Sequence, residues 1–439
     1  MTNANSGGAE RVTSAGVPGR REAQVLAQTD LPRALAVARA IGQPLGKAMT
    51  QVGRTFSLGR MHMQDKNFEA EWAAEAAEEE ADRQRKSETP PALDRDDFLA
   101  WRSPREVGDT PTRLDNPLWH WLVRTRHSAY SANKAFDGPS AFEAGPMWCF
   151  DRFGKSETPL PDGRVVHIGG EHEDHYDPDF FIYNDVTLID PDGSIEIHGY
   201  ARETFPPTDF HSATLVGDAI FIVGGLGYPR QRVLGRTPVF CLALDTMMIT
   251  RFGASGEAPG WIHRHSAELA DDGRSIVARG GELWMGDDRS MRENIDAWSL
   301  DVANGRWTRL SALDWQRWTM VRVDRKPNRL WDVRQELWHR EHAWAGHESY
   351  WKHDDAPDFE ALAALYRLDE TAPAPEQGSE HNVYRVIIDD VAVRFTEDRW
   401  SVQAMVEGRL SDARLNELQR ETLATLQRLD ASAWEIEPQ

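Results

Sequence analysis

Short runs of apolar, often β-branched residues alternate with polar turns through the middle of the chain, from about residue 153 to residue 310. In one example, residues 211–216 and 219–223 flank a turn at Gly217-Asp218. Two such runs joined by a Gly/Asp turn predict a β-hairpin. The same order occurs around turns at residues 161–163 and 271–273.

A Gly-Gly doublet closes the second run of each hairpin, at Gly169-Gly170, Gly224-Gly225 and Gly280-Gly281. Successive doublets lie 55 and 56 residues apart. Such regular spacing indicates a repeat architecture, in which each unit is a small sheet that packs against its neighbours. Glycine at a strand end lets two backbones approach closely, so we assign these six glycines a structural role.

A polar loop follows each doublet, and a second pair of strands follows the loop. These pairs are clearest at residues 184–189 with 194–197 and at residues 294–300 with 306–310. Four strands in each unit is the composition of a propeller blade. The sequence therefore predicts a mainly β protein that contains three four-stranded repeats.

The units resemble kelch repeats, whose period is about 50 residues. The resemblance rests on the doublets, on the His-Ser-Ala sequence at His211 and His265, and on Trp298 and Trp307 in the third unit. It implies a propeller or a partial propeller. Because closed propellers usually have four to eight blades, we expect flanking strands to complete the ring, with an open arc capped by helices as the alternative. Repetition favours a structural role for the two histidines, such as a bond to the backbone of the adjacent blade.

The segments on either side of the repeats divide the chain into three predicted parts. Residues 1–93 are expected to form a flexible and helical arm, residues 94–320 a kelch-like β domain with a leading helix at about 117–134, and residues 321–439 a C-terminal α+β domain. In the last part, the pattern predicts strands at 383–388, 391–395 and 400–406 and then a helix at 411–429. Further helices are predicted at about 31–41, 68–85, 330–341 and 356–368.

The composition narrows the class of protein. The chain has 439 residues and a formal net charge of −21, which argues against general affinity for nucleic acid or for anionic membrane surfaces. Its two cysteines, Cys149 and Cys241, lack metal-type spacing, and no apolar stretch approaches the length of a membrane span. We therefore expect a cytoplasmic protein.

The loops after the doublets are the predicted interaction surface, because loops on a rigid scaffold often carry function. In kelch-like propellers these loops gather on one face. The candidate binding residues there are Arg230, Arg232, Arg236, Trp284 and Asp287. No strong catalytic motif accompanies them, since the chain lacks a Gly-x-Ser-x-Gly nucleophile elbow. The favoured hypothesis is a scaffold that binds another protein and is not an enzyme.

The loop at residues 171–179 supports an alternative hypothesis, a metal-dependent enzyme. His172, Asp174, His175 and Asp177 offer nitrogen and oxygen ligands for a divalent metal. Acidic runs are also common in solvated loops, and these residues follow no recognised ligand spacing. The sequence predicts no cofactor apart from this metal.

Overall fold

The computed structural model describes residues 65–108, 110–173, 180–287, 289, 291–342, 349, 351–359, 366, 375–377 and 382–437. The chain divides into two compact units, Met1–Glu80 with Trp338–Lys352 and Ala81–Leu337 with His353–Gln439. The described part of the first unit consists mainly of the beginning of α4 (Asp65–Lys86) and the end of α9 (Arg329–His342). The predicted helix at 31–41 and most of the one at 356–368 lie outside the described residues.

Four short helices precede the first large sheet of the second unit: α5 (Arg95–Trp101), α6 (Pro117–Thr125), α7 (Ala129–Ala135) and α8 (Ala141–Ala144). The prediction of a single helix over residues 117–134 is therefore wrong, because the chain forms two helices there, α6 and α7. Asn116 caps α6 by accepting the Trp119 N–H at 2.8 Å, and Arg126 ends it with a φ of 53°. Ser128 then caps α7.

These helices pack on the first sheet. Trp119 of α6 stacks on Trp148 with ring centroids 4.5 Å apart. Ile195 and Ile197 of the sheet belong to the same buried cluster as the two tryptophans. The helix α6 therefore packs on the first repeat sheet.

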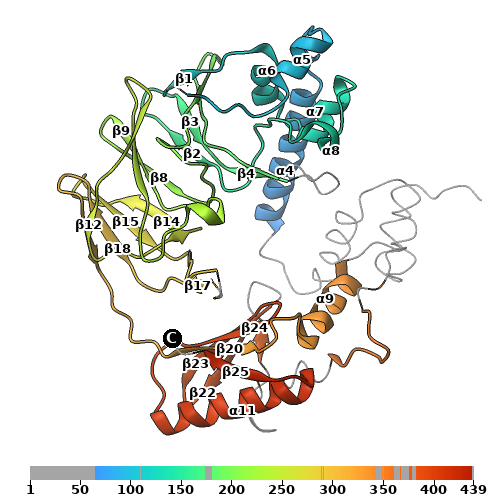
Figure 1. Ribbon diagram of the computed structural model, residues 1–439, viewed down its shortest axis with the longest axis vertical. Helices are drawn as coiled ribbons and strands as arrows, with labels where there is room; N and C mark the ends of the chain where they lie inside the picture. The colour runs from blue at the N-terminus through green and yellow to red at the C-terminus, as the bar shows by residue number, and fades with distance from the viewer. Residues whose placement is uncertain are drawn as a thin grey trace, which may run out of the picture. The chain divides into compact units, whose positions relative to one another are not determined.

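Each predicted repeat forms a sheet whose four main strands are antiparallel, within the described residues (Figure 1). The first sheet contains β2 (Ser156–Pro159), β3 (Val165–Ile168), β6 (Val186–Ile189) and β7 (Ile195–Gly199), with β1 (Thr112–Arg113) added beside β7. The second contains β8 (Ser212–Val216), β9 (Ala219–Val223), β10 (Val239–Ala243) and β11 (Met248–Arg251). The third contains β14 (Ser266–Leu269), β15 (Ser275–Arg279), β18 (Trp298–Asp301) and β19 (Arg306–Arg309), with β12 (Ser255–Gly256) parallel to β19.

Two smaller sheets are built from the ends of loops. The first pairs β4 (Glu171–His172) with β5 (Phe181–Ile182), and the second has the order β13-β16-β17. Its strands are β13 (Ile262–His263), β16 (Glu282–Leu283) and β17 (Arg292–Glu293).

The C-terminal sheet has the strand order β21-β22-β23-β24-β20-β25. The strands are β20 (Arg317–Arg322), β21 (Glu376–Gln377), β22 (Val383–Ile388), β23 (Val391–Glu397), β24 (Ser401–Val406) and β25 (Trp434–Glu437). The helix α11 (Asp412–Asp430) lies along this sheet, so the predicted β-β-β-α order is confirmed (Figure 1). Residue 320, the predicted end of the β domain, falls inside β20.

The structure is thus a mixture of helices and mostly antiparallel sheets. The described strands form no closed propeller. The expectation that flanking strands complete a ring was wrong, because β1 extends the first repeat sheet and β20 pairs with β24 and β25 in the C-terminal sheet. None of the described helices is long and apolar enough to cross a lipid bilayer.

Neighbouring repeat sheets are joined through equivalent positions just before their first strands. Gly154, Phe210 and Arg264 all have positive φ, between 50° and 63°. The Phe210 N–H donates to the Gly154 carbonyl at 2.7 Å, and the Arg264 N–H donates to the Phe210 carbonyl at 2.8 Å. The same backbone contact therefore recurs from the first sheet to the second and from the second to the third.

The first glycine of each of the first two doublets lies where one repeat sheet meets the next. A Cβ added to Gly169 would be 2.3 Å from the Thr208 carbonyl oxygen, and one added to Gly224 would be 2.3 Å from that of Ile262. At Gly280 a Cβ would meet no described atom within 4 Å. Gly280 differs from Gly169 and Gly224 because, among the described residues, no further repeat sheet packs after the third one.

Candidate functional site

A cleft of about 260 Å³ lies beside the second Gly-Gly doublet. Its walls come from the loop after β7, the loop between β9 and β10, and the end of β11. Arg202, Arg236 and Arg251 are the charged residues that line it within the described chain, while Phe240 and Trp261 add aromatic surface.

Internal hydrogen bonds hold the loop between β9 and β10 in place. The 3-10 turn Pro229–Gln231 is closed by the Gln231 N–H, which donates to the Tyr228 carbonyl at 2.9 Å. The Arg232 guanidinium donates to the carbonyls of Leu226 and Gly227, at 3.1 and 3.0 Å. The loop is thus anchored by its own backbone, while the side chains of Arg230 and Arg236 are exposed.

The cleft has an excess of positive charge. Among the described residues, neither Asp nor Glu lines it. Burial lowers the pKa of Arg251, and the neighbouring charge of Arg236 lowers it further. Arg202 pairs with Glu106 at 2.8 Å, but this glutamate is 72% exposed and lies outside the cleft. An anionic group that entered the cleft would relieve this repulsion.

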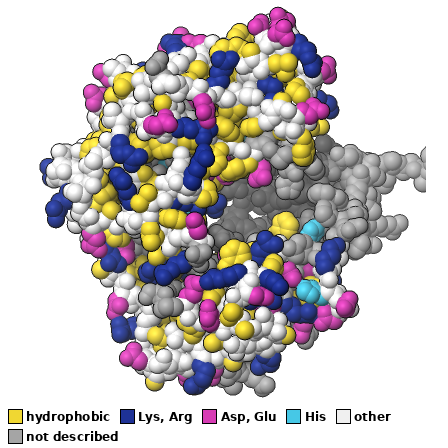
Figure 2. Space-filling model, in the orientation of Figure 1, with side chains coloured by type: hydrophobic (Ala, Val, Ile, Leu, Met, Phe, Trp, Pro, Cys, Tyr) yellow, Lys and Arg dark blue, Asp and Glu magenta, His cyan; other side chains and the backbone are white. Residues whose placement is uncertain are grey.

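Apolar side chains lie next to the arginines on the same loop. Val233 is 49% exposed and lines the cleft, and Leu234 is 61% exposed. Over the strands β8 and β9, Figure 2 shows Lys and Arg side chains interspersed with hydrophobic ones. This combination of charge and apolar surface favours a ligand that carries both kinds of group.

The predicted binding residues have different positions in the structure. Arg236 lies in the cleft and Arg230 is exposed nearby, whereas the half-buried Arg232 uses its side chain to shape the loop. Trp284 is half-buried and Asp287 is exposed, and neither lines the cleft. Sequence reasoning missed Arg202 and Arg251, because they come from segments outside the loops that follow the doublets.

Of the predicted metal ligands, the structure describes His172. Its ring lies in the protein interior, and its Nδ1 is 2.9 Å from the hydroxyl of Tyr183. Asp174, His175 and Asp177 lie outside the described residues. Within the described ranges, no group of three or more His, Cys, Asp or Glu residues could hold a metal ion.

Two carboxyl groups meet near the same loop. Asp209 is fully buried, and its Oδ1 accepts the Gly227 N–H at 2.7 Å. Its other oxygen, Oδ2, is buried without a hydrogen-bond partner among the described residues. Burial and the charge of Asp209 raise the pKa of Glu171 to about 7, and burial also raises the pKa of Asp209.

Glu171 also lines a more open cavity of about 570 Å³. Phe153, Phe210, Arg264 and the equivalent histidines His211 and His265 contribute to its wall. His211 shares a hydrogen bond with Ser156 of the first repeat, and His265 shares one with Ser212 of the second. These contacts support the predicted structural role of the histidines, although the partners are side-chain hydroxyl groups and not backbone atoms.

Comparison of the chain with protein-family models and with curated proteins finds no match.

Proposed function

We propose that this chain is a binding protein built on kelch-like repeats, and that it holds an acidic segment of a partner protein in the cleft lined by Arg202, Arg236 and Arg251. The observation that carries the proposal is a set of arginines with no acidic residue among the described residues that line the cleft. This local excess of positive charge occurs in a chain whose net charge is −21. A carboxylate is a suitable occupant, because guanidinium groups bind carboxylates with two parallel hydrogen bonds.

The surroundings of the cleft favour a peptide segment over a free small molecule. The volume of about 260 Å³ is slightly below the range of roughly 300–1,000 Å³ that is typical of small-molecule pockets. Beyond the cleft, the exposed side chains of Val233 and Leu234 offer apolar contacts to a longer ligand. A nucleic acid is disfavoured, since the net charge of the chain would repel a polyanion.

The kelch-like part of the proposal is supported by the contacts between repeats. Gly169 and Gly224 lie at contacts between neighbouring sheets, and the two histidines bond the preceding repeat. Both features are expected of blades that pack one after another. The described repeats would then form a partial propeller that positions the loops after the doublets.

Selection of random 12-residue peptides on the full chain tests the binding function. We expect enriched peptides to contain Asp or Glu beside apolar residues. Binding of the best peptide should weaken at least about tenfold in an Arg236→Glu/Arg251→Glu variant, because each charged hydrogen bond contributes about 1.5–3 kcal/mol. Arg274→Glu changes an exposed arginine of the third repeat and should leave the affinity within about twofold. Enrichment of peptides without acidic residues, or equal binding by the double variant, would contradict the proposal.

A second candidate function is a metal-dependent reaction at the loop of residues 171–179. The observation in its favour is the carboxyl group of Glu171, which begins this loop and has a pKa of about 7, as a general acid requires. Elemental analysis of the full chain beside a His175→Ala variant tests it. About one metal per chain, lost in the variant, would support the enzyme, whereas metal-free protein would remove its basis.

A further inference from the structure

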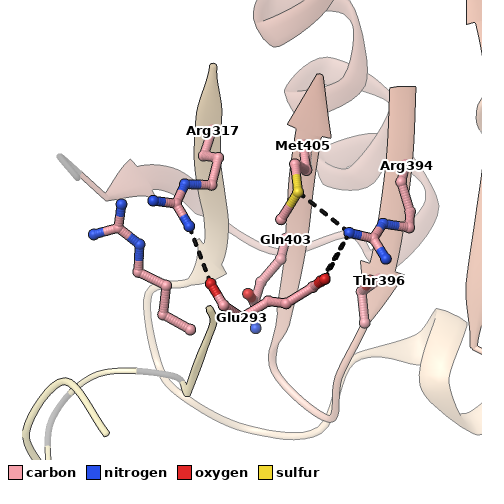
Figure 3. A pocket seen from close by; sticks show the side chains of 8 residues that line it. Glu293, Arg317, Arg394, Thr396, Gln403 and Met405 are labelled. Atoms are coloured by element: carbon pink, nitrogen blue, oxygen red, sulfur yellow. Dashed lines mark hydrogen bonds and ion pairs between the residues drawn. The ribbon is translucent and has the colours of Figure 1, made fainter. Parts of the chain in front are cut away.

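Three arginines converge at a third, smaller cavity, where β17 meets the C-terminal sheet. Arg292 comes from β17, Arg317 from β20 and Arg394 from β23, and all three line the cavity together with Glu293. Arg317 and Arg394 lie on either side of Glu293 (Figure 3). The cavity between these side chains has a volume of about 20 Å³. Since a cavity needs roughly 10–15 Å³ to hold one water molecule, this space suits an occupant of one or two atoms.

The carboxylate of Glu293 is engaged mainly by one of the three arginines. Its two oxygens lie 3.0 and 2.8 Å from Nη2 of Arg394. Arg317 reaches only the backbone carbonyl of Glu293, at 3.1 Å. Nε of Arg292 is buried and finds no hydrogen-bond partner among the described residues.

The carboxylates near this cluster are shared with other arginines. Asp296, whose charge acts on both Arg292 and Arg317, forms an ion pair of 2.5 Å with Arg309. Burial lowers the pKa of Arg317 to about 10, and the charge of Arg292 lowers it further, while the charges of Asp296 and Glu293 oppose the shift. Burial also lowers the pKa of Arg292. Two partly buried guanidinium groups that repel each other make a favourable environment for an anion.

We propose that this cavity binds a single small inorganic anion of the size of chloride, held between Arg292 and Arg317. Nε of Arg292 would donate to the ion, and Arg317 would neutralise the rest of its charge. The volume excludes a phosphate or sulfate group, whose central atom carries four oxygens.

The bound anion would stabilise the contact between the third repeat and the C-terminal sheet. Gln403 of β24 already donates to the Met291 carbonyl at 2.9 Å in this region, so the two sheets meet through polar groups. An ion that binds only when these segments are in contact raises the stability of the folded chain as its concentration rises.

Two measurements on the full chain test the proposal. The first is thermal unfolding at constant ionic strength while sodium chloride replaces sodium gluconate, whose anion is too large for the cavity. We expect Tm to rise by about 2 °C for each tenfold increase in chloride once the site is filling. Arg292→Gln should abolish this rise, while Arg274→Gln should retain it. Equal Tm values in the two salts, or an unchanged rise in Arg292→Gln, would overturn the proposal.

The second measurement keeps the test valid if Arg292→Gln does not fold. The ³⁵Cl NMR line of chloride should broaden with the wild-type protein and should broaden less with Arg317→Gln. Added phosphate at equal ionic strength should leave the broadening unchanged. Displacement by phosphate would overturn the assignment of a monatomic anion, and absence of excess broadening by the wild type would overturn the site itself.

Discussion

Ser212 and His265 belong to neighbouring repeats and share a hydrogen bond of 2.9 Å between the hydroxyl oxygen and Nε2 of the imidazole. Ser156 and His211 form the same contact, at 2.8 Å, one repeat earlier. Each histidine is thus bonded to the first strand of the preceding sheet. This contact holds adjacent repeats in register through residue types that recur in the sequence.

Loss of this hydrogen bond should destabilise the repeat domain. Ser212→Ala removes the hydroxyl group and leaves Nε2 of His265 buried without its partner, which should lower the free energy of unfolding by about 1–3 kcal/mol. Urea denaturation followed by circular dichroism measures the change. The matched control is Ser266→Ala, because Ser266 is exposed and bonds only the Arg279 carbonyl of its own sheet at 3.3 Å. A control variant as unstable as Ser212→Ala would contradict this explanation.

Stability should fall in mild acid because of the same histidines. Burial lowers the pKa of His211 to about 3 and that of His265 to about 4, against about 6.5 in the unfolded chain. The unfolded state therefore binds more protons below pH 6.5, so the free energy of unfolding decreases from pH 6.5 down to about pH 4. His265→Gln should reduce this slope by about 1 kcal/mol per pH unit. Urea denaturation at several pH values checks the result, and equal slopes would show that His265 is not buried in its neutral form.

Two equivalent glycines should respond differently to the same substitution. Gly224 and Gly280 have φ values of 70° and 63°, so alanine costs about 1–2 kcal/mol of backbone strain at either position. Only at Gly224 would the new methyl group also clash with the Ile262 carbonyl. Gly224→Ala should therefore lower the free energy of unfolding by clearly more than Gly280→Ala. Equal losses in urea denaturation would mean that the sheets do not meet closely at Gly224.

The raised pKa of Glu171 should make the stability of the fold depend on pH between about 4.5 and 7. The raised pKa of about 7 means that this group stabilises the fold fully below its unfolded value of 4.5, and that this contribution is lost as the pH rises through 7. Glu171→Gln replaces the carboxyl group by an amide that carries no charge at any pH, so the cost of ionising a partly buried group beside Asp209 disappears. The variant should therefore gain stability relative to wild type between pH 5 and pH 8.

Thermal unfolding across this pH range measures the effect, and Glu173→Gln, an exposed neighbour, serves as the control. A Glu171→Gln variant whose stability relative to wild type does not change with pH would show that Glu171 is ionised in the folded protein.

The sequence by itself determined the repeat and its strands. Gly/Asp turns and glycines with positive φ depend on the backbone preferences of single residues, which a sequence shows directly. The Gly-Gly doublets, 55 and 56 residues apart, therefore predicted the three repeat sheets. Alternation of polar and apolar residues likewise predicted the strands β22 to β24, and apolar residues at helical spacing predicted the helix α11. The break between α6 and α7 was missed, since Arg126 carries no strong local signal for a left-handed conformation.

Only the tertiary structure decided which side chains meet. Arg202, Arg236 and Arg251 come from three separate segments, and their convergence depends on how the first two repeats pack. Glu171 and Asp209 likewise meet across neighbouring repeats, and His172, which had seemed available for a metal, faces Tyr183 in the interior. The arginines around Glu293 come together because β20 joins the C-terminal sheet. Such contacts join residues far apart in the sequence, and local pattern contains no information about long-range packing.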